Sequence, residues 1–275
     1  MWGLAEEAAV DQRTRHPEPD GDPERMGRAG LTLEPRIRRL RRMWRTIPSA
    51  PRCKMCHSPF GAPGGPVLRL LGKGKWPGNP KYCAGCFKDL YRNRHGAEIE
   101  CSLLFADIRG STALAESMSA SAFRGLLDRF YATATEVLIE RDAIVDKYVG
   151  DEVIGIFVPA LTDGNHAQQA IDAGLDLLRE TGHQTDAPWA PTGIGINTGV
   201  AFVGVVGTAD HVEFTALGDS VNVTARLASI AGRGEILVTD AAVAASGLTS
   251  ADNREHRTLE LRGRTETTEV LVLTL

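Results

Sequence analysis

From residue 99 onward the sequence alternates between apolar strand patterns and amphipathic helix patterns, and this alternation limits the fold more than any other feature. The patterns predict helices over 119–140, 165–181 and 219–231, and strands over 99–108, 143–148, 153–158, 192–206, 211–216, 235–239, 257–261 and 268–275. Residues 149–152, with Gly150 and Asp151 between two strands, predict a tight hairpin. Helices interleaved with a hairpin-rich sheet favour an α+β sandwich of palm type.

The first third of the chain differs from this segment in charge. Residues 1–99 carry 19 Lys and Arg against 10 Asp and Glu, whereas residues 100–275 carry 12 against 25. Hydrophobic residues make up 43% of the chain, which excludes wholesale disorder, and no apolar stretch reaches the roughly 20 residues of a membrane span. The polar, acidic start is not typical of a secretory signal, so a cytoplasmic protein is expected.

These differences predict four segments. Residues 1–31 are expected to form a disordered tail, because 11–30 are rich in Pro, Gly and charged side chains. Residues 32–47 are expected to form a basic amphipathic helix, 48–96 a small cysteine module and 97–275 the large α+β domain. We expect the helix to pack on the neighbouring domain, with a membrane surface or a nucleic acid as the alternative contacts.

Four of the five cysteines form two C-x-x-C pairs, Cys53 with Cys56 and Cys83 with Cys86. This spacing is typical of a zinc-ribbon-like site in which four thiolates bind one structural Zn²⁺. An iron–sulfur cluster, redox-switched thiols and cysteines without metal are the alternatives, and His57 could replace one ligand. The glycine-rich residues between the pairs predict a looped ribbon. Cys101 is expected to be a small core hydrophobe.

A carboxylate and a helix start meet at the end of the strand 99–108. Asp107 ends the strand, and Gly110 then leads into a helix whose free N–H groups predict a phosphate site, with Ser111 or Thr112 as capping hydroxyls. Asp151, at the hairpin tip, is expected to meet Asp107 across adjacent strands. Two carboxylates beside phosphates suit Mg²⁺ or Mn²⁺.

Three separated blocks resemble the catalytic domain of the class III adenylate and guanylate cyclases, in the order of that family. Residues 104–112 (LFADIRGST) are similar to the first metal motif, and residues 147–152 (KYVGDE) to the block with the base-selecting Lys and the second metal Asp. Residues 214–227 (FTALGDSVNVTARL) are similar to the block that carries a second base contact and then Asn and Arg. The resemblance runs from about residue 99 to the C-terminus and implies a ferredoxin-like βαββαβ domain.

The resemblance implies that the ribose 3'-hydroxyl attacks the α-phosphate of the same nucleotide, which yields a cyclic monophosphate and pyrophosphate. The implied site has Asp107, Ile108 and Asp151 as ligands of two Mg²⁺ or Mn²⁺ ions, and Asn222 and Arg226 as catalytic residues at the ribose and phosphates. The implied substrate contacts are Lys147, Thr215, Ile108, Gly110, Ser111, Thr112 and Arg264.

The choice of base is expected to depend on Lys147 and Thr215. A lysine donates to adenine N1 and a threonine accepts from the adenine amino group, whereas guanine calls for an acceptor such as Glu. ATP is therefore the expected substrate and adenylate cyclase the expected activity, with guanylate cyclase as the alternative. Thr215 stands where the better-known membrane adenylyl cyclases have Asp, and it resembles the branch that includes bicarbonate-responsive members.

The family also implies a head-to-tail homodimer with two shared sites, because its site forms between two catalytic domains and this chain has one copy of each residue. The metal-binding aspartates of one chain would act with the base, ribose and phosphate contacts of its mate. The cysteine module is then expected to be regulatory. A nucleic-acid-binding zinc ribbon does not explain the three blocks, so no nucleic-acid partner is expected, and the complete residue set argues against an inactive cyclase-like scaffold.

Overall fold

A computed structural model describes residues 35–47, 49, 51–53, 55–76, 79–86, 96–207, 212–248, 255–262, 264 and 266–275. The expected tail over residues 1–31 lies outside the described residues. Within this described part, no helix is long and apolar enough to cross a membrane.

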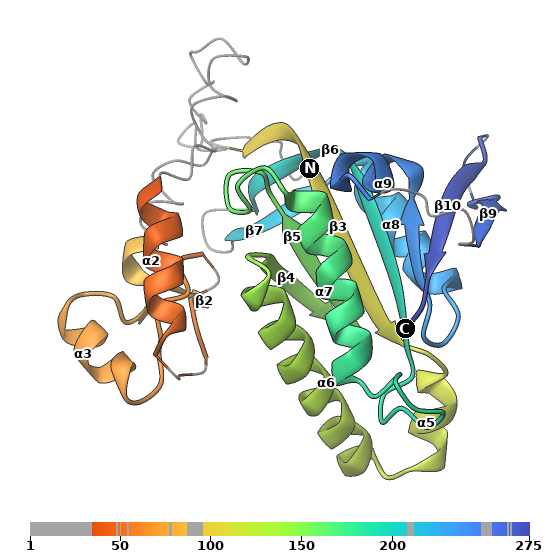
Figure 1. The fold of residues 1–275 in the computed structure, drawn as a ribbon. Coiled ribbons are helices and arrows are strands. Elements are labelled where there is room, and N and C mark those ends of the chain that lie inside the picture. The colour runs from red at the N-terminus through yellow and green to blue at the C-terminus, as the bar shows by residue number, and fades with distance from the viewer. Residues whose placement is uncertain are drawn as a thin grey trace, which may run out of the picture.

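A mixed sheet of eight strands forms the centre of the large domain (Figure 1). Its strands are β3 (Gly96–Ile108), β4 (Ile144–Val149), β5 (Glu152–Phe157), β6 (Thr192–Gly207), β7 (Val212–Leu217), β8 (Ile236–Thr239), β9 (His256–Leu259) and β10 (Thr268–Leu273). They lie in the order β4-β5-β3-β6-β8-β10-β9, with β7 paired to β6. Strands β6 and β8 pair in parallel, and the long β3 pairs antiparallel with β5 and β6. The predicted α+β palm fold is confirmed.

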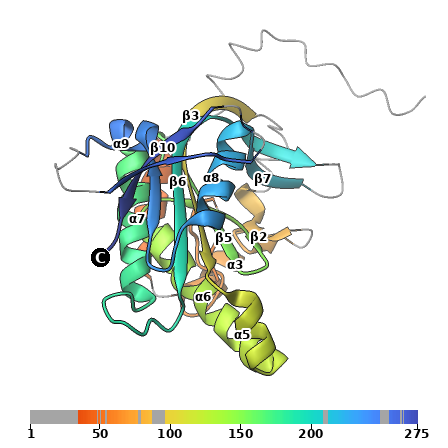
Figure 2. The ribbon, with the colours of Figure 1, turned by 90° about the vertical axis from the view of Figure 1, so that its right-hand side faces the viewer.

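Helices cover both faces of this sheet. Helices α6 (Ala120–Glu140), α7 (His166–Glu180) and α9 (Asp240–Ser246) lie on one face, and α8 (Asp219–Ile230) lies on the other (Figure 2). The short α5 (Ser111–Ser117) follows β3 directly. The α9 helix was not predicted, because seven residues are too few to show a helical period clearly.

The alternating side chains of β3 explain how one strand contributes to two cores. Leu104, Ala106 and Ile108 belong to the core beneath α6 and α7. Leu103 and Phe105 point to the opposite face and belong to the second core, together with the fully buried side chain of Cys101. This second core extends into the cysteine module.

The basic helix is α2 (Pro35–Arg45), and the cysteine module that follows it contains α3 (Gly64–Leu70), β1 (Lys75–Trp76) and β2 (Asn79–Cys83). Helix α3 lies where the glycines had predicted a loop. Gly65 is required there for close packing, since a Cβ atom on it would lie 2.1 Å from the Phe60 carbonyl oxygen. Glycine in this segment therefore permits a close approach inside a helix, rather than a turn.

Two buried side chains join α2 and this module to the large domain. Arg41 of α2 is fully buried and donates to the carbonyl oxygens of Asp142 and Ala143, at 3.3 and 2.7 Å, just before β4. Tyr82 of β2 is also buried, and its hydroxyl accepts a 3.1 Å hydrogen bond from the Phe214 N–H of β7. Helix α2 thus contacts the neighbouring domain through Arg41, a basic side chain of its pattern.

Candidate active site

Asp107 and Asp151 lie at the same end of two adjacent strands. Asp107 on β3 pairs in register with Glu152 of β5, and Asp151 directly precedes Glu152 in the turn between β4 and β5. Tyr131 of α6 supports this turn, because its hydroxyl donates to the carbonyl oxygen of Gly150. The arrangement is the one expected from the sequence, while the role of these carboxylates as metal ligands stays a prediction.

The sequence did not single out Arg109, which lies beside these carboxylates. Its guanidinium pairs with Oδ2 of Asp107 and donates to the Ser229 carbonyl oxygen at 2.7 Å. Burial lowers the pKa of Arg109, while the charges of Asp151 and Glu152 oppose that shift. The position of Arg109, two residues after the strand-ending aspartate, is the signal that could have identified it.

Glu152 is a third carboxyl group at this end of the sheet, and it too was not singled out. Burial, together with the nearby charge of Asp151, raises the pKa of Glu152 to about 7, and the charge of Arg109 opposes this shift. Its place next to Asp151 in the sequence was visible, but its pairing with Asp107 depends on strand register.

This acidic end of the sheet fits a divalent cation. Oδ1 of Asp107 is buried and has no hydrogen-bond partner among the described residues. With Asp151 beside it, the site offers the carboxylate oxygens that Mg²⁺ and Mn²⁺ prefer.

The start of α5 differs in one detail from the expectation. Gly110 is itself the N-cap residue, with a φ of 71°, and no side chain caps this helix. Ser111 and Thr112 therefore lie inside the first turn, where a hydroxyl does not reach the N–H groups that an N-cap side chain satisfies. The expectation that one of them caps the helix was wrong.

Asp146 brings the two expected base contacts together. The Thr215 hydroxyl donates to Oδ2 of Asp146 at 2.6 Å, and the Lys147 ammonium lies 3.5 Å from the same oxygen. Thr215 is 2% exposed and Asp146 is 5% exposed, whereas the Lys147 side chain is 34% exposed. The sequence did not single out Asp146, because its contact with Thr215 joins residues 69 positions apart.

Helix α8 carries the expected ribose and phosphate contacts. Asn222 is exposed and Arg226 is half-buried, and the two lie one turn apart. Arg264 forms an ion pair with Asp219, the first residue of α8. The Arg264 guanidinium has five N–H donors, so it can contact a phosphate while this pair is intact.

The four cysteines of the C-x-x-C pairs form a cluster in which all four sulfur atoms lie within 4.8 Å of one another. Hydrogen bonds with the other three cysteines lower the pKa of Cys56, and a hydrogen bond with Cys53 lowers the pKa of Cys83 to about 7. Burial raises the pKa of Cys53, and hydrogen bonds with the other three cysteines raise the pKa of Cys86. Two of the four thiols, Cys56 and Cys83, therefore form thiolates readily, as metal ligands must. His57 lies outside the cluster, because its Nε2 accepts from Arg41 at 2.7 Å.

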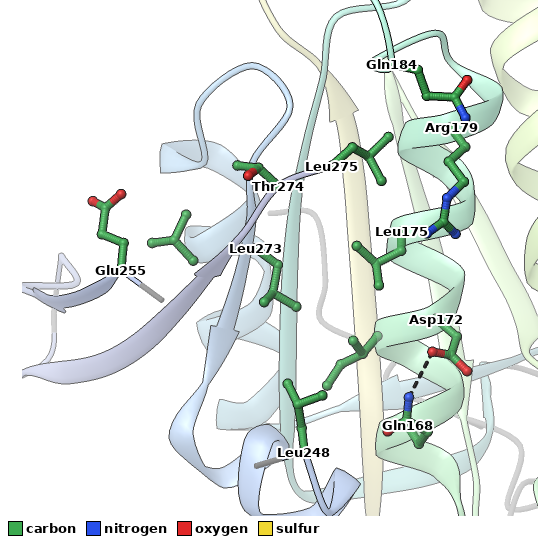
Figure 3. Close-up of a pocket in the computed structure, with 12 residues that line it drawn as sticks. Gln168, Asp172, Leu175, Arg179, Gln184, Leu248, Glu255, Leu273, Thr274 and Leu275 are labelled. Carbon is green, nitrogen blue, oxygen red and sulfur yellow. Dashed lines mark hydrogen bonds between the residues drawn. The ribbon is translucent and has the colours of Figure 1, made fainter. Parts of the chain in front are cut away.

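A hollow of about 690 Å³ lies away from all these residues, between α7 and the C-terminal strand (Figure 3). Leu175, Leu248 and Leu273 line it, and Gln168 donates to Asp172 at its edge. It contains none of the expected site residues, so the chemistry described above does not take place there.

The palm sheet, with acidic residues at the ends of adjacent strands, defines a nucleotide cyclase fold. Residues 94–274 match the family described as the adenylate and guanylate cyclase catalytic domain, and the chain belongs to this family. Residues 94–274 thus form a class III nucleotide cyclase domain, in agreement with the three sequence blocks.

Curated relatives share this domain within longer proteins. The chain is 32% identical over 149 residues to an adenylate cyclase of Anabaena cylindrica, covering 52% of this chain and 30% of that protein. It is 29% identical over 134 residues to adenylate cyclase 1 of Rhizobium meliloti, covering 46% of this chain and 20% of that protein. The chain thus spans less than a third of the length of either relative.

Solved structures agree on the fold. The adenylyl cyclase CyaB from P. aeruginosa matches with a TM-score of 0.56 and 25% identity, over 66% of this chain and 97% of that one. The guanylyl cyclase Cya2 matches with a TM-score of 0.58 and 24% identity, over 64% of this chain and 92% of that one. Both kinds of cyclase share this fold, so the fold does not decide the base.

Proposed function

We propose that this chain is an adenylate cyclase that converts ATP to 3',5'-cyclic AMP and pyrophosphate. The observation that carries the proposal is the partly exposed Lys147 beside the buried Asp146 and Thr215. An ammonium group donates to adenine N1, whereas guanine has an N1–H donor there and requires an acceptor. The names of the Anabaena and Rhizobium relatives agree with this choice.

Residues at the ends of β3 and α8 supply the rest of the proposed chemistry. Asp107, Ile108 and Asp151 would hold two Mg²⁺ or Mn²⁺ ions, which lower the pKa of the attacking hydroxyl and neutralise the triphosphate when bound. Asn222 orients the ribose, and Arg226 stabilises the charge that develops on the phosphates. The segment Gly110, Ser111 and Thr112 lies along the triphosphate.

Two copies of the chain complete the proposed site. The metal-binding aspartates come from one protomer, and the base, ribose and phosphate contacts come from its partner. A head-to-tail homodimer therefore contains two equivalent sites. This arrangement follows from the family to which the chain belongs, in which dimers are typical.

We propose that the cysteine module binds one structural Zn²⁺ and regulates the cyclase. A tetrahedral zinc site with Zn–S bonds of about 2.3 Å places its sulfur atoms about 3.8 Å apart. The sulfur atoms of Cys56 and Cys83 are 3.8 Å apart, which supports one ion at the centre of the cluster. Tyr82, next to Cys83 in β2, contacts the residue before Thr215, so the module lies against a strand of the proposed base site.

The deciding experiment is an assay of the purified protein with ATP or GTP in the presence of Mn²⁺ or Mg²⁺. We expect cyclic AMP and pyrophosphate in equal amounts from ATP and much slower turnover of GTP. Preferred turnover of GTP would make the chain a guanylate cyclase. No product from either nucleotide, with folded dimeric protein, would make it an inactive scaffold.

A further inference from the structure

Asp146 is a buried charged residue whose role the sequence did not assign. A buried carboxylate is stable only where hydrogen bonds and cations replace the water that it loses. The Thr215 hydroxyl donates to its Oδ2 at 2.6 Å, and the Lys147 ammonium lies 3.5 Å from that oxygen. Asp146 therefore contacts both side chains to which the proposed function assigns the choice of base.

A β-bulge in β4 makes this arrangement possible. Val145 pairs with Gly155 and Tyr148 pairs with Val153, so Asp146 and Lys147 together oppose one residue of β5. Neighbouring side chains on a regular strand point to opposite faces of the sheet. A bulge redirects one of them, and bulges are frequent beside active sites. The ammonium of Lys147 can therefore approach the carboxylate of the residue before it.

The hydrogen bond to Asp146 decides whether the Thr215 hydroxyl can donate a hydrogen bond to a ligand or only accept one. A threonine hydroxyl has one proton to donate and two lone pairs that accept. Because its proton points to Asp146, Thr215 can only accept from a base. Adenine carries an amino donor at position 6, and guanine carries an oxygen acceptor there. An acceptor-only threonine therefore complements adenine and opposes guanine.

We propose that Asp146 is a positioning residue for base selection, which holds Lys147 as the donor and Thr215 as the acceptor and so sets the preference for ATP over GTP. The proposal rests on the adenylate cyclase activity proposed above. Lys147 is already accessible, whereas Thr215 is closed to solvent in the single chain. Contact between the Thr215 hydroxyl and a base therefore requires the covering side chains to move.

The test compares kcat/KM for ATP and for GTP in the full-length protein and its variants. Asp146→Asn keeps the shape of the side chain but can present an N–H group to Thr215, whose hydroxyl is then free to donate to guanine. We expect the ATP:GTP ratio to fall at least tenfold. We expect a similar fall in Thr215→Val and little further fall in the double variant, because both residues act through one network.

Two control variants isolate the effect. Thr215→Ser keeps the hydroxyl and is expected to keep the ratio within about twofold of the wild type. Asp186→Asn makes the same chemical change in an exposed loop and is expected to leave the ratio unchanged. Circular dichroism and size-exclusion chromatography show whether each variant is folded. Thr215→Val removes the same hydrogen bond from the other partner, so the test does not depend on Asp146→Asn alone.

A substrate analogue provides a second readout. Purine riboside 5'-triphosphate lacks the 6-amino group, so the wild type is expected to prefer ATP to it. Asp146→Asn and Thr215→Val are expected to lose that preference.

Three outcomes would overturn the proposal. If the wild type prefers ATP and the ATP:GTP ratio of Asp146→Asn stays within twofold of the wild-type ratio, the positioning role of Asp146 alone is overturned. Additive losses in the double variant would also overturn it. A wild type that prefers GTP would overturn the adenylate activity itself and the preference assigned to Asp146.

Discussion

The carboxylates at the acidic end of the sheet carry the first expectation at the scale of single residues. Asp107→Ala and Asp151→Ala are each expected to lower cyclase activity more than tenfold, because one remaining aspartate cannot hold two ions in place. Cyclic AMP formation and Mn²⁺ binding to the free protein measure the two effects. Asp186→Ala, in an exposed loop, is the matched control. More than a tenth of wild-type activity in both folded variants would contradict the two-metal site.

A second residue pair gives a pH-dependent expectation. Arg257 donates to both carboxylate oxygens of Glu235, at 2.7 and 3.0 Å, and the Gly232 N–H donates to it at 2.7 Å. The hydrogen bonds from Arg257 lower the pKa of Glu235, and the Gly232 N–H lowers it further. A lowered carboxyl pKa adds stability that is complete above the ordinary carboxyl range and is lost as the pH falls through the lowered value.

Glu235→Gln is therefore expected to lower the free energy of unfolding by about 1–2 kcal/mol at pH 7, and by much less at about pH 3. Urea unfolding at both pH values measures the difference. Glu269→Gln is the control, because its carboxylate accepts from Thr258 on an exposed strand pair and little change is expected at either pH. An equal loss for Glu235→Gln at both pH values would mean that packing, rather than charge, accounts for its effect.

At the scale of elements, the cysteine cluster joins β2 to the turn that contains Cys53 and Cys56. Cys83 donates its N–H to the Cys53 sulfur at 3.2 Å, and the cluster shares an apolar core with the large domain. Loss of a bound metal is therefore expected to loosen β2 and to weaken that shared core.

Metal analysis of the full chain is expected to find about one zinc per chain. Cys83→Ala is expected to lose this zinc and to lower the melting temperature by several degrees, since a structural metal contributes directly to folding. Cys101→Ala removes a buried thiol outside the cluster and is expected to keep the zinc. Iron and sulfide in place of zinc would favour the iron–sulfur alternative, and a full zinc content in Cys83→Ala would exclude the four-thiolate site.

At the scale of the whole molecule, the shared site predicts complementation between two inactive chains. Asp107→Ala removes a metal ligand and Asn222→Ala removes a ribose contact, and each homodimer is expected to be inactive. A mixed dimer contains one site without either substitution, so mixing is expected to restore up to about a quarter of wild-type activity when subunits exchange at random. Mixing two samples of Asp107→Ala is the control. No recovery after verified subunit exchange would place the whole site within one chain.

The sequence by itself determined the helices and strands, and those parts of the candidate sites that are made by residues close together in the chain. Apolar periodicity predicted the long helices and most strands, because periods of 3.6 and 2 are properties of local geometry. The spacing of the C-x-x-C pairs predicted the four-cysteine cluster, and short blocks around Asp107, Asp151 and Thr215 predicted the family, now confirmed.

The tertiary structure decided what depends on strand register and on contacts between distant segments. The approach of Glu152 to Asp107 follows from the pairing of β3 with β5. The guanidinium of Arg109, which pairs with Asp107, also donates to the distant carbonyl oxygen of Ser229. The hydrogen bond between Asp146 and Thr215 joins residues 69 positions apart, and it accompanies a bulge that no periodicity shows. Such contacts form only when distant segments pack together on the two faces of the sheet. Sequence patterns do not show them, because each pattern reports only its own segment of the chain.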